Sequence, residues 1–213
     1  MKELIIPGTV TPESVWLKEI LTEEQESIGK ITVEKENRHF SSMNGILYNK
    51  DRTKLIFYPR AKRRRSYRMP DSVKIIAAGA FADGKHFNGS LEQVSLSPSM
   101  TEIPDNCFKN MNIYSVDIPE GIKRIGKDAF ANTNLVCPTL PASLKSLSQT
   151  AFSGCARMHM LNIKEDGFGL NMSMLPQNVE IYVIFETTEE VDHTKYPGIS
   201  VMNIPEMEVW LEN

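Results

Sequence analysis

A phenylalanine recurs along the middle of the chain, and each copy ends a unit with the same pattern of residues. The units read MPDSVKIIAAGAF (69–81), SPSMTEIPDNCF (97–108), PEGIKRIGKDAF (119–130) and PASLKSLSQTAF (141–152). The phenylalanines are Phe81, Phe108, Phe130 and Phe152, spaced by 27, 22 and 22 residues. Two apolar columns keep the same spacing: Val73, Met100, Ile122, Leu144 and Ile76, Ile103, Ile125, Leu147. This shared register indicates an internal repeat, which restricts the chain to architectures that stack one unit on the next.

A second phrase with alternating apolar residues lies between these units. It reads LEQVSL (91–96), IYSVDI (113–118), LVCPTL (135–140) and MHMLNI (158–163). Such alternation over a short run predicts a β-strand. Weaker copies lie at 1–6, 28–33, 67–69, 179–183 and 199–204. We therefore expect a parallel sheet of about seven to nine short strands that runs almost from end to end.

One unit of this size cannot close a hydrophobic core alone, but stacked units bury each apolar column against its neighbours. Successive strands would lie about 4.8 Å apart. The return segments that hold the Ala-Phe pairs would place each phenylalanine ring behind the sheet, where an aromatic ring fills core. The expected molecule is an elongated slab with one open sheet face.

The units LEQVSLSPSMTEIPDNCF, IYSVDIPEGIKRIGKDAF and LVCPTLPASLKSLSQTAFSGC resemble the BspA-type leucine-rich repeats of bacterial surface proteins, which read roughly LxxVxIPxxVxxIGxxAFxxC. NGILYNKDRTKLIFYP (44–59) matches the hairpin phrase of that family. The resemblance implies a leucine-rich-repeat solenoid, a right-handed superhelix with short return segments. The chain departs from the pattern at Cys107, at Pro138 and at a five-residue insertion near 85–89.

The whole chain is predicted to form a single leucine-rich-repeat domain. Its expected parts are a degenerate N-terminal unit with a helix (1–40), a β-hairpin (41–60), regular repeats (64–165) and a C-terminal cap (166–213). In the hairpin, residues 46–48 should pair with residues 55–58 across the polar turn 49–54.

The segment 11–27 is the expected helix. Pro12 suits a first-turn position, and Val15, Trp16, Glu19 and Ile20 have helical spacing, so they should form the buried face.

Composition indicates an ordinary soluble domain, with 213 residues, 41% hydrophobic residues and a net charge of -3. No apolar run approaches the roughly 18 residues of a membrane helix, so membrane insertion is not expected. MKELIIPG does not read as a signal peptide. Because the resembled family is usually exported, we expect a fragment of an extracellular or cell-surface protein, present as a monomer.

The residues that could carry chemistry do not form a recognisable site, so neither enzyme activity nor a cofactor is expected. Cys107, Cys137 and Cys155 are odd in number and are expected to be buried or half-buried. Zinc binding by Cys155 and His159 would need a second ligand pair. GAFADGKH (79–86) approaches a phosphate-binding loop but has His86 where Ser or Thr belongs. His39, His86, His159 and His193 lie in different units.

A basic run is the largest charge feature: Arg60, Lys62, Arg63, Arg64, Arg65 and Arg68. It could bind a polyanion of the glycosaminoglycan type, or it could be a solvated connector after the hairpin. Nucleic acid is not expected, because the run has little aromatic interleaving.

The open sheet face is the leading candidate for function. In an alternating strand the residue between the last two apolar positions points away from the core, which defines three outward rows. They read Arg68, Ser95, Asp117, Thr139, Asn162; then Ser66, Gln93, Ser115, Cys137, Met160; and, at the rim, Arg65, Glu92, Tyr114, Val136, His159. Solenoids commonly bind partners on such surfaces. The resemblance then implies a non-enzymatic module that binds a protein or host matrix through this face, with a ligand-free structural spacer as a further alternative.

Overall fold

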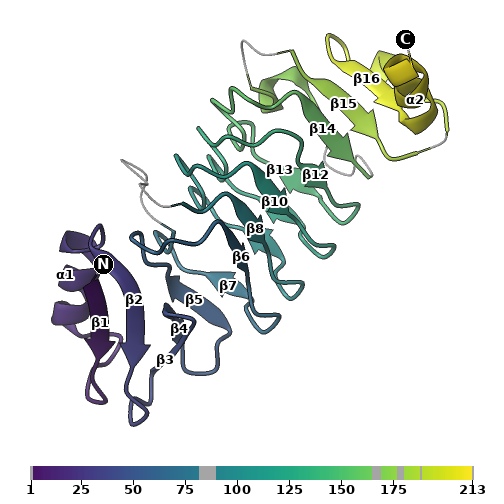
Figure 1. Ribbon diagram of the computed structural model, residues 1–213. Coiled ribbons are helices and arrows are strands. Elements are labelled where there is room, and N and C mark those ends of the chain that lie inside the picture. Colours follow the sequence, from purple (N-terminus) through teal and green to yellow (C-terminus); the bar gives the residue numbers. More distant parts are fainter. Residues whose placement is uncertain (1, 82–89, 165–168, 177–179, 188, 213) are drawn as a thin grey trace.

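The computed structural model describes residues 2–81, 90–164, 169–176, 180–187 and 189–212. The chain forms an elongated solenoid in which short strands stack from the N-terminal to the C-terminal end (Figure 1). Each regular turn contains one strand of a main row and then one two-residue strand of a second row. The leucine-rich-repeat solenoid predicted from the repeat is thereby confirmed.

The main row has a strand at each of the nine predicted positions. These strands are β1 (Lys2–Ile6), β2 (Ile28–Val33), β6 (Ser66–Arg68), β8 (Gln93–Ser95), β10 (Ser115–Asp117), β12 (Thr139–Leu140), β14 (Met160–Ile163), β15 (Tyr182–Phe185) and β16 (Ser200–Asn203). All the pairings between them are parallel. The row is divided into three hydrogen-bonded sheets, β1-β2, β6-β8-β10 and β12-β14-β15-β16. It therefore continues into the segment assigned above to a C-terminal cap.

Both interruptions of the main row have a local cause. Between β2 and β6 the chain makes the hairpin, whose strands belong to another sheet. Beside β10, Pro138 lacks the N–H that a strand donates to its ladder, and β12 begins only after it. The main chain still follows β10 there, since the Val136 N–H donates to the Tyr114 carbonyl at 3.4 Å.

A second row of two-residue strands was not predicted. It consists of β7 (Ile75–Ile76), β9 (Glu102–Ile103), β11 (Arg124–Ile125) and β13 (Ser146–Leu147). In each of them the first residue is exposed and the second is buried. Two residues are too few to produce a periodic signal, so these segments could be interpreted only as return segments.

The hairpin has three strands rather than two: β3 (Phe40–Met43), β4 (Ile46–Asn49) and β5 (Lys54–Phe57). The predicted pairing is confirmed, with Tyr48 opposite Leu55. The missed strand β3 joins β4 through Asn44 and Gly45, whose φ angles are 54° and 77°. An Asn-Gly pair is the usual signal for such a two-residue turn, so this strand could have been found. β5 then pairs in parallel with β7. It therefore takes the place of the second-row strand in the solenoid turn that contains the hairpin.

The N-terminal helix α1 spans Val15–Glu23. Of its predicted apolar face, Ile20 packs against the core as expected, whereas Val15 and Trp16 do not. Leu17 is buried, and Ile20 and Leu21 pack against the same N-terminal cluster. Val15 and Trp16 are instead 65% and 43% exposed. Leu17, Ile20 and Leu21 have i, i+3, i+4 spacing, so they form a helical face of their own. Pro12 is also not in the first turn, because the helix begins after Ser14.

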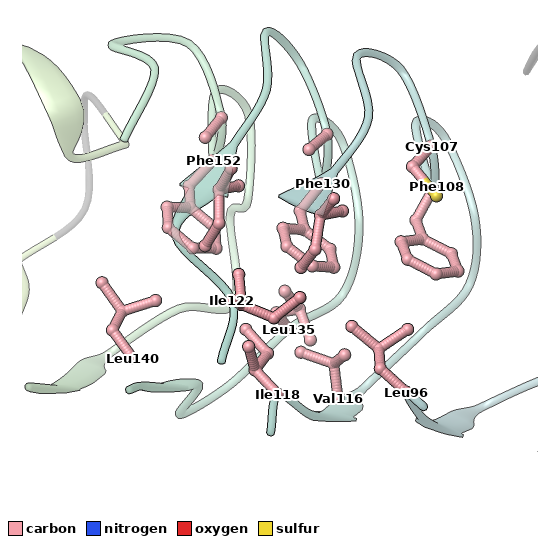
Figure 2. Packing of buried hydrophobic residues seen from close by; sticks show 14 of the residues in the cluster. Leu96, Cys107, Phe108, Val116, Ile118, Ile122, Phe130, Leu135, Leu140 and Phe152 are labelled. Atoms are coloured by element: carbon pink, nitrogen blue, oxygen red, sulfur yellow. The ribbon is translucent and has the colours of Figure 1, made fainter. Parts of the chain in front are cut away.

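A stack of aromatic rings forms the centre of the core (Figure 2). Phe81, Phe108, Phe130 and Phe152 have no exposed surface. Consecutive rings from Phe108 to Phe152 have centroids 5.5 Å apart and interplanar angles of 10° and 7°. The spacing of the phenylalanines thus becomes one ring per turn, as predicted.

The described C-terminal part contains two short 3-10 helices, η1 (Met172–Met174) and η2 (His193–Lys195), and the helix α2 (Ile204–Glu212). Asn203 and Glu206 begin α2 with a reciprocal pair of bonds, in which each side chain accepts from the other residue's N–H. Within the described ranges, neither helix is long and apolar enough to cross a membrane.

Candidate binding surface

The outward rows predicted from the sequence lie together on the open sheet face. The strand register places Arg68 beside Ser95 and Ser95 beside Asp117. The same register aligns Ser66, Gln93 and Ser115, and farther along Thr139 pairs with Asn162. Of the predicted ligand-binding residues, Arg68, Gln93, Ser115, Asp117 and His159 are exposed, and Glu92, Ser95, Tyr114, Thr139 and Asn162 are half-buried. The face is therefore open to solvent and mostly polar.

The predicted rim row is held by main-chain hydrogen bonds from turn to turn. The Glu92 N–H donates to the Arg65 carbonyl, and the Tyr114 N–H donates to the Glu92 carbonyl, both at 2.8 Å. The His159 N–H continues the series to Val136 at 3.1 Å. Because each bond fixes the next turn, the side chains of the rim are presented at a regular spacing.

Sequence reasoning missed one member of the rim, Arg157. Its guanidinium carbon lies 5.7 Å from the centroid of the Tyr114 ring, within the range of a cation–π contact. Val136, on the turn between these two residues, is 41% exposed. A tyrosine, an arginine and an exposed aliphatic side chain thus gather at one edge of a polar face.

The opposite edge of the face carries an ion pair. Lys164, which follows β14, lies 3.0 Å from Glu120, which follows β10. The hydrogen bond between them raises the pKa of Lys164 and lowers the pKa of Glu120. Both side chains are largely exposed, so the pair contributes at most about 1 kcal/mol to stability.

The basic run does not form one patch. Arg60 is 5% exposed and forms an ion pair with Glu26, so its assignment to a surface patch is wrong. The reason is that the chain turns inward there, where the Ala61 N–H donates to the Ile28 carbonyl at 2.9 Å. Arg65 lies 3.7 Å from Glu92, and Arg68 lies 3.9 Å from Asp71. Lys62, Arg63 and Arg64 lie in the sequence between the buried Arg60 and the paired Arg65.

The three cysteines are free. Cys107 and Cys155 are buried as expected, and burial raises the pKa of both thiols. Cys137 is exposed, contrary to the prediction, because it belongs to an outward row.

Cys155 and His159, weighed above as zinc ligands, do not form a metal site in the described part of the chain. Cys155 Sγ donates to the Phe130 carbonyl at 3.1 Å inside the core, whereas His159 is exposed. No group of three or more His, Cys, Asp or Glu residues within the described ranges could hold a metal ion. Residues 82–86 of the loop-like GAFADGKH, and the insertion near 85–89, lie outside the described residues.

A main row of parallel strands, a short second strand and one buried phenylalanine in each turn define a leucine-rich-repeat solenoid. The model of the BspA type leucine rich repeat region matches residues 56–178 in six copies, and the chain belongs to this family. A search of curated protein sequences gives no match.

Three solved structures share the fold. The pneumococcal vaccine antigen PcpA has a TM-score of 0.67 at 20% identity, over 95% of this chain and 56% of its own. A leucine-rich repeat protein from Eubacterium ventriosum has a TM-score of 0.64 at 21% identity, over 90% of this chain and 55% of its own. A leucine rich cell surface protein from Faecalibacterium prausnitzii has a TM-score of 0.56 at 24% identity, over 76% of this chain and 47% of its own. The chain therefore spans about half the length of these proteins.

Proposed function

We propose that this chain is a non-enzymatic binding module of a bacterial surface or secreted protein. Its partner would be a protein, such as one of the host matrix, docked on the sheet face between β6 and β14. The family and the description of the Faecalibacterium prausnitzii protein as a cell surface protein support the location. The fold supports the role, because solenoids present extended surfaces that bind partners.

The observation that carries the proposal is the edge formed by Tyr114 and Arg157. Tyrosine and arginine are enriched among the residues that dominate the energy of protein interfaces. Here the two side chains contact each other, and the main chain of Tyr114 is held in the ladder of the rim. A surface that is ordered before binding loses less conformational entropy when the partner docks.

The polar rows beside this edge would complete the interface. Gln93, Ser115 and Asp117 are exposed and offer amide, hydroxyl and carboxylate groups at fixed spacing. Such groups suit the hydrogen-bonded rim of an interface rather than its apolar centre. The anchor would therefore lie at Tyr114, and the polar rows would set specificity.

The test is binding of the purified chain to an array of extracellular-matrix proteins. For any protein captured, we expect Tyr114→Ala with Arg157→Ala to weaken binding by about 2 kcal/mol or more, roughly 30-fold. The matched control is Ile75→Ala with Arg124→Ala, which truncates an exposed aliphatic side chain and an arginine on the second row.

Equal losses in the two double variants would contradict docking on the sheet face. The absence of saturable binding to every protein of the array would favour the spacer alternative instead.

A further inference from the structure

A cleft opens where the main row is interrupted between β2 and β6. It has a volume of about 510 Å³ and lies between β2, the β3–β4 turn and the connector that follows the hairpin. Its polar lining consists of Lys30, Thr32, Ser42, Asn44, Lys62, Arg63 and Arg64. A smaller cleft of about 300 Å³ shares Lys62 and Arg64 and leads toward Arg68 on the sheet face. The interruption of the sheet thus produces a recess within an otherwise open surface.

Four cations line this recess, and only Lys30 among them is paired with a carboxylate in the part of the chain that the structure describes. Lys30 lies on β2. The other three cations, Lys62, Arg63 and Arg64, lie on the connector that follows the hairpin. In the part of the chain that the structure describes, no carboxylate forms an ion pair with Lys62, Arg63 or Arg64. Glu3 neutralises Lys30, at 2.8 Å, and also accepts from the Thr32 hydroxyl at 2.6 Å.

The cations that line the recess repel one another. Burial lowers the pKa of Lys62, and the charges of Arg64 and Lys30 lower it further. The Lys62 ammonium donates to the Asn44 carbonyl, which holds it at the cleft. An anion between these groups would offset the repulsion, so the electrostatics of the cleft favour a negatively charged ligand.

The walls of the cleft are fixed by the main chain. The Ile31 N–H donates to the Gly45 carbonyl at 3.0 Å, and the Ala61 N–H donates to the Ile28 carbonyl at 2.9 Å. A Cβ atom at Gly45 would lie 3.0 Å from Lys30 Cγ and 3.2 Å from Lys62 Nζ, and φ there is +77°. Glycine therefore lets the two cationic side chains approach the turn. Because β2 holds both walls, little ordering is needed on binding.

The lining distinguishes among anions. None of the described residues that line the larger cleft is aromatic. Tyr67, which lines the smaller cleft, is half-buried and its hydroxyl lies 2.7 Å from that of Tyr48, so the site lacks the exposed stacking surface that single-stranded nucleic acid uses. The aliphatic side chain of Ile31 is only 1% exposed, so the larger cleft offers little apolar side-chain surface to a peptide anchor. What the cleft offers is cations beside the hydroxyls of Thr32 and Ser42 and the amide of Asn44. These groups match a sugar that carries sulfate or carboxylate groups and free hydroxyls.

We propose that this cleft binds an acidic oligosaccharide, with a sulfate or carboxylate group seated among Lys62, Arg63 and Arg64. The smaller cleft would take the next sugar in the direction of Arg68. This site is separate from the Tyr114 edge and does not depend on the protein-binding function proposed above.

The test is calorimetric titration of the whole chain with a heparin-derived hexasaccharide and with its desulfated form. We expect binding of the sulfated form and weakening by at least about 10-fold in Arg63→Gln with Arg64→Gln. The control is Lys123→Gln with Lys145→Gln, which removes the same charge from exposed positions beside the second row. It should change the affinity by less than about 2-fold. Equal weakening in both double variants would show attraction by net charge alone and would overturn the proposal.

A second variant tests the cleft without any change of charge. Thr32 points outward from β2 and is half-buried, so Thr32→Phe would fill the recess with a residue that suits a strand. We expect a loss of about 10-fold or more. Unchanged binding would place the ligand elsewhere. If thermal unfolding shows that Thr32→Phe does not fold, Arg64→Lys is the alternative variant. It keeps the positive charge but loses the planar guanidinium group. Unchanged affinity of Arg64→Lys would likewise overturn the proposal.

The class of ligand is tested by competition. A polyglutamate peptide or a single-stranded oligonucleotide that binds as tightly as the hexasaccharide would exclude specificity for sugars. Tyr114→Ala with Arg157→Ala should leave hexasaccharide binding unchanged, so failure at one surface is distinguishable from failure at the other.

Discussion

The ring of Tyr58 stacks on the ring of Phe81, with centroids 5.3 Å apart and an interplanar angle of 22°. The main chain is equivalent as well: the Tyr58 N–H donates to the Ala80 carbonyl at 2.7 Å, as the Phe108 N–H donates to the Ala129 carbonyl at 2.8 Å. Tyr58 therefore holds the position of the repeated phenylalanine in the turn that contains the hairpin. It differs from the others by one hydroxyl group, which is buried and forms no hydrogen bond with the residues described.

We expect Tyr58→Phe to raise the free energy of unfolding by about 1 kcal/mol, because it removes a buried polar group that has lost its water. Urea denaturation at neutral pH would measure the change. Tyr48→Phe is the contrasting variant, since its hydroxyl lies 2.7 Å from that of Tyr67, and its loss should destabilise the fold. A lower urea midpoint for Tyr58→Phe would contradict the assignment of an unsatisfied hydroxyl.

Stability should fall at alkaline pH. Burial raises the pKa of Tyr58 to about 12, with the Arg64 charge opposing and Tyr48 adding to the shift. Burial also raises the pKa of Tyr48 and Tyr67. The unfolded chain releases these protons near pH 10 while the folded chain keeps them. The contribution of these protonated tyrosines to stability is therefore fully present below about pH 10. It is lost as the pH rises toward the pKa values of the tyrosines in the folded chain. Urea midpoints between about pH 8 and about pH 11 should decline less steeply in Tyr58→Phe than in the wild type.

A left-handed residue lies two positions after Phe108, Phe130 and Phe152, at Asn110, Asn132 and Gly154, with φ angles of 60°, 56° and 71°. The Asn132 amide also donates to the Asn110 side-chain oxygen at 2.8 Å. Asn132→Ala should cost about 1–2 kcal/mol, because alanine is strained at this φ and the hydrogen bond is lost. Asn132→Gly should cost less, because only the bond is lost. Equal denaturation midpoints for the two variants would show that backbone strain is not the cause.

Gly126 lies against Asp105, so a larger residue should not fit there. A Cβ atom at Gly126 would lie 2.2 Å from Asp105 Oδ1 and 2.7 Å from Asp105 N. Asp105 is held in place, since Oδ1 accepts from Arg124 at 2.7 Å and from the Lys127 N–H at 2.9 Å. Gly126→Ala should destabilise the protein by about 1–3 kcal/mol in urea denaturation.

The control for Gly126→Ala is Ser148→Ala, at the equivalent position of the next turn, where a Cβ atom is already present. It should change stability by less than about 0.5 kcal/mol. A Gly126→Ala protein as stable as the wild type would mean that the Asp105 turn can move.

The strand row could be predicted because a side chain's position in an alternating strand follows from sequence parity. Arg68, Ser95 and Asp117 align in the structure as the spacing requires. Arg157 could not be assigned in the same way. Its contact with Tyr114 depends on how a long side chain crosses an intervening turn, which no repeat spacing specifies.

The repeat, the core columns and the outward rows follow from the amino-acid sequence alone, because one unit copied along the chain must bury the same positions in every turn. Where the repeat is broken, the arrangement of the residues depends on the three-dimensional fold. The hairpin places Tyr58 in the aromatic stack, buries Arg60 and brings Lys30 beside Lys62 and Arg64. The path of an insertion depends on long-range packing rather than on periodicity. For that reason the candidate cleft, which lies where the hairpin interrupts the repeat, could not be predicted from the repeat.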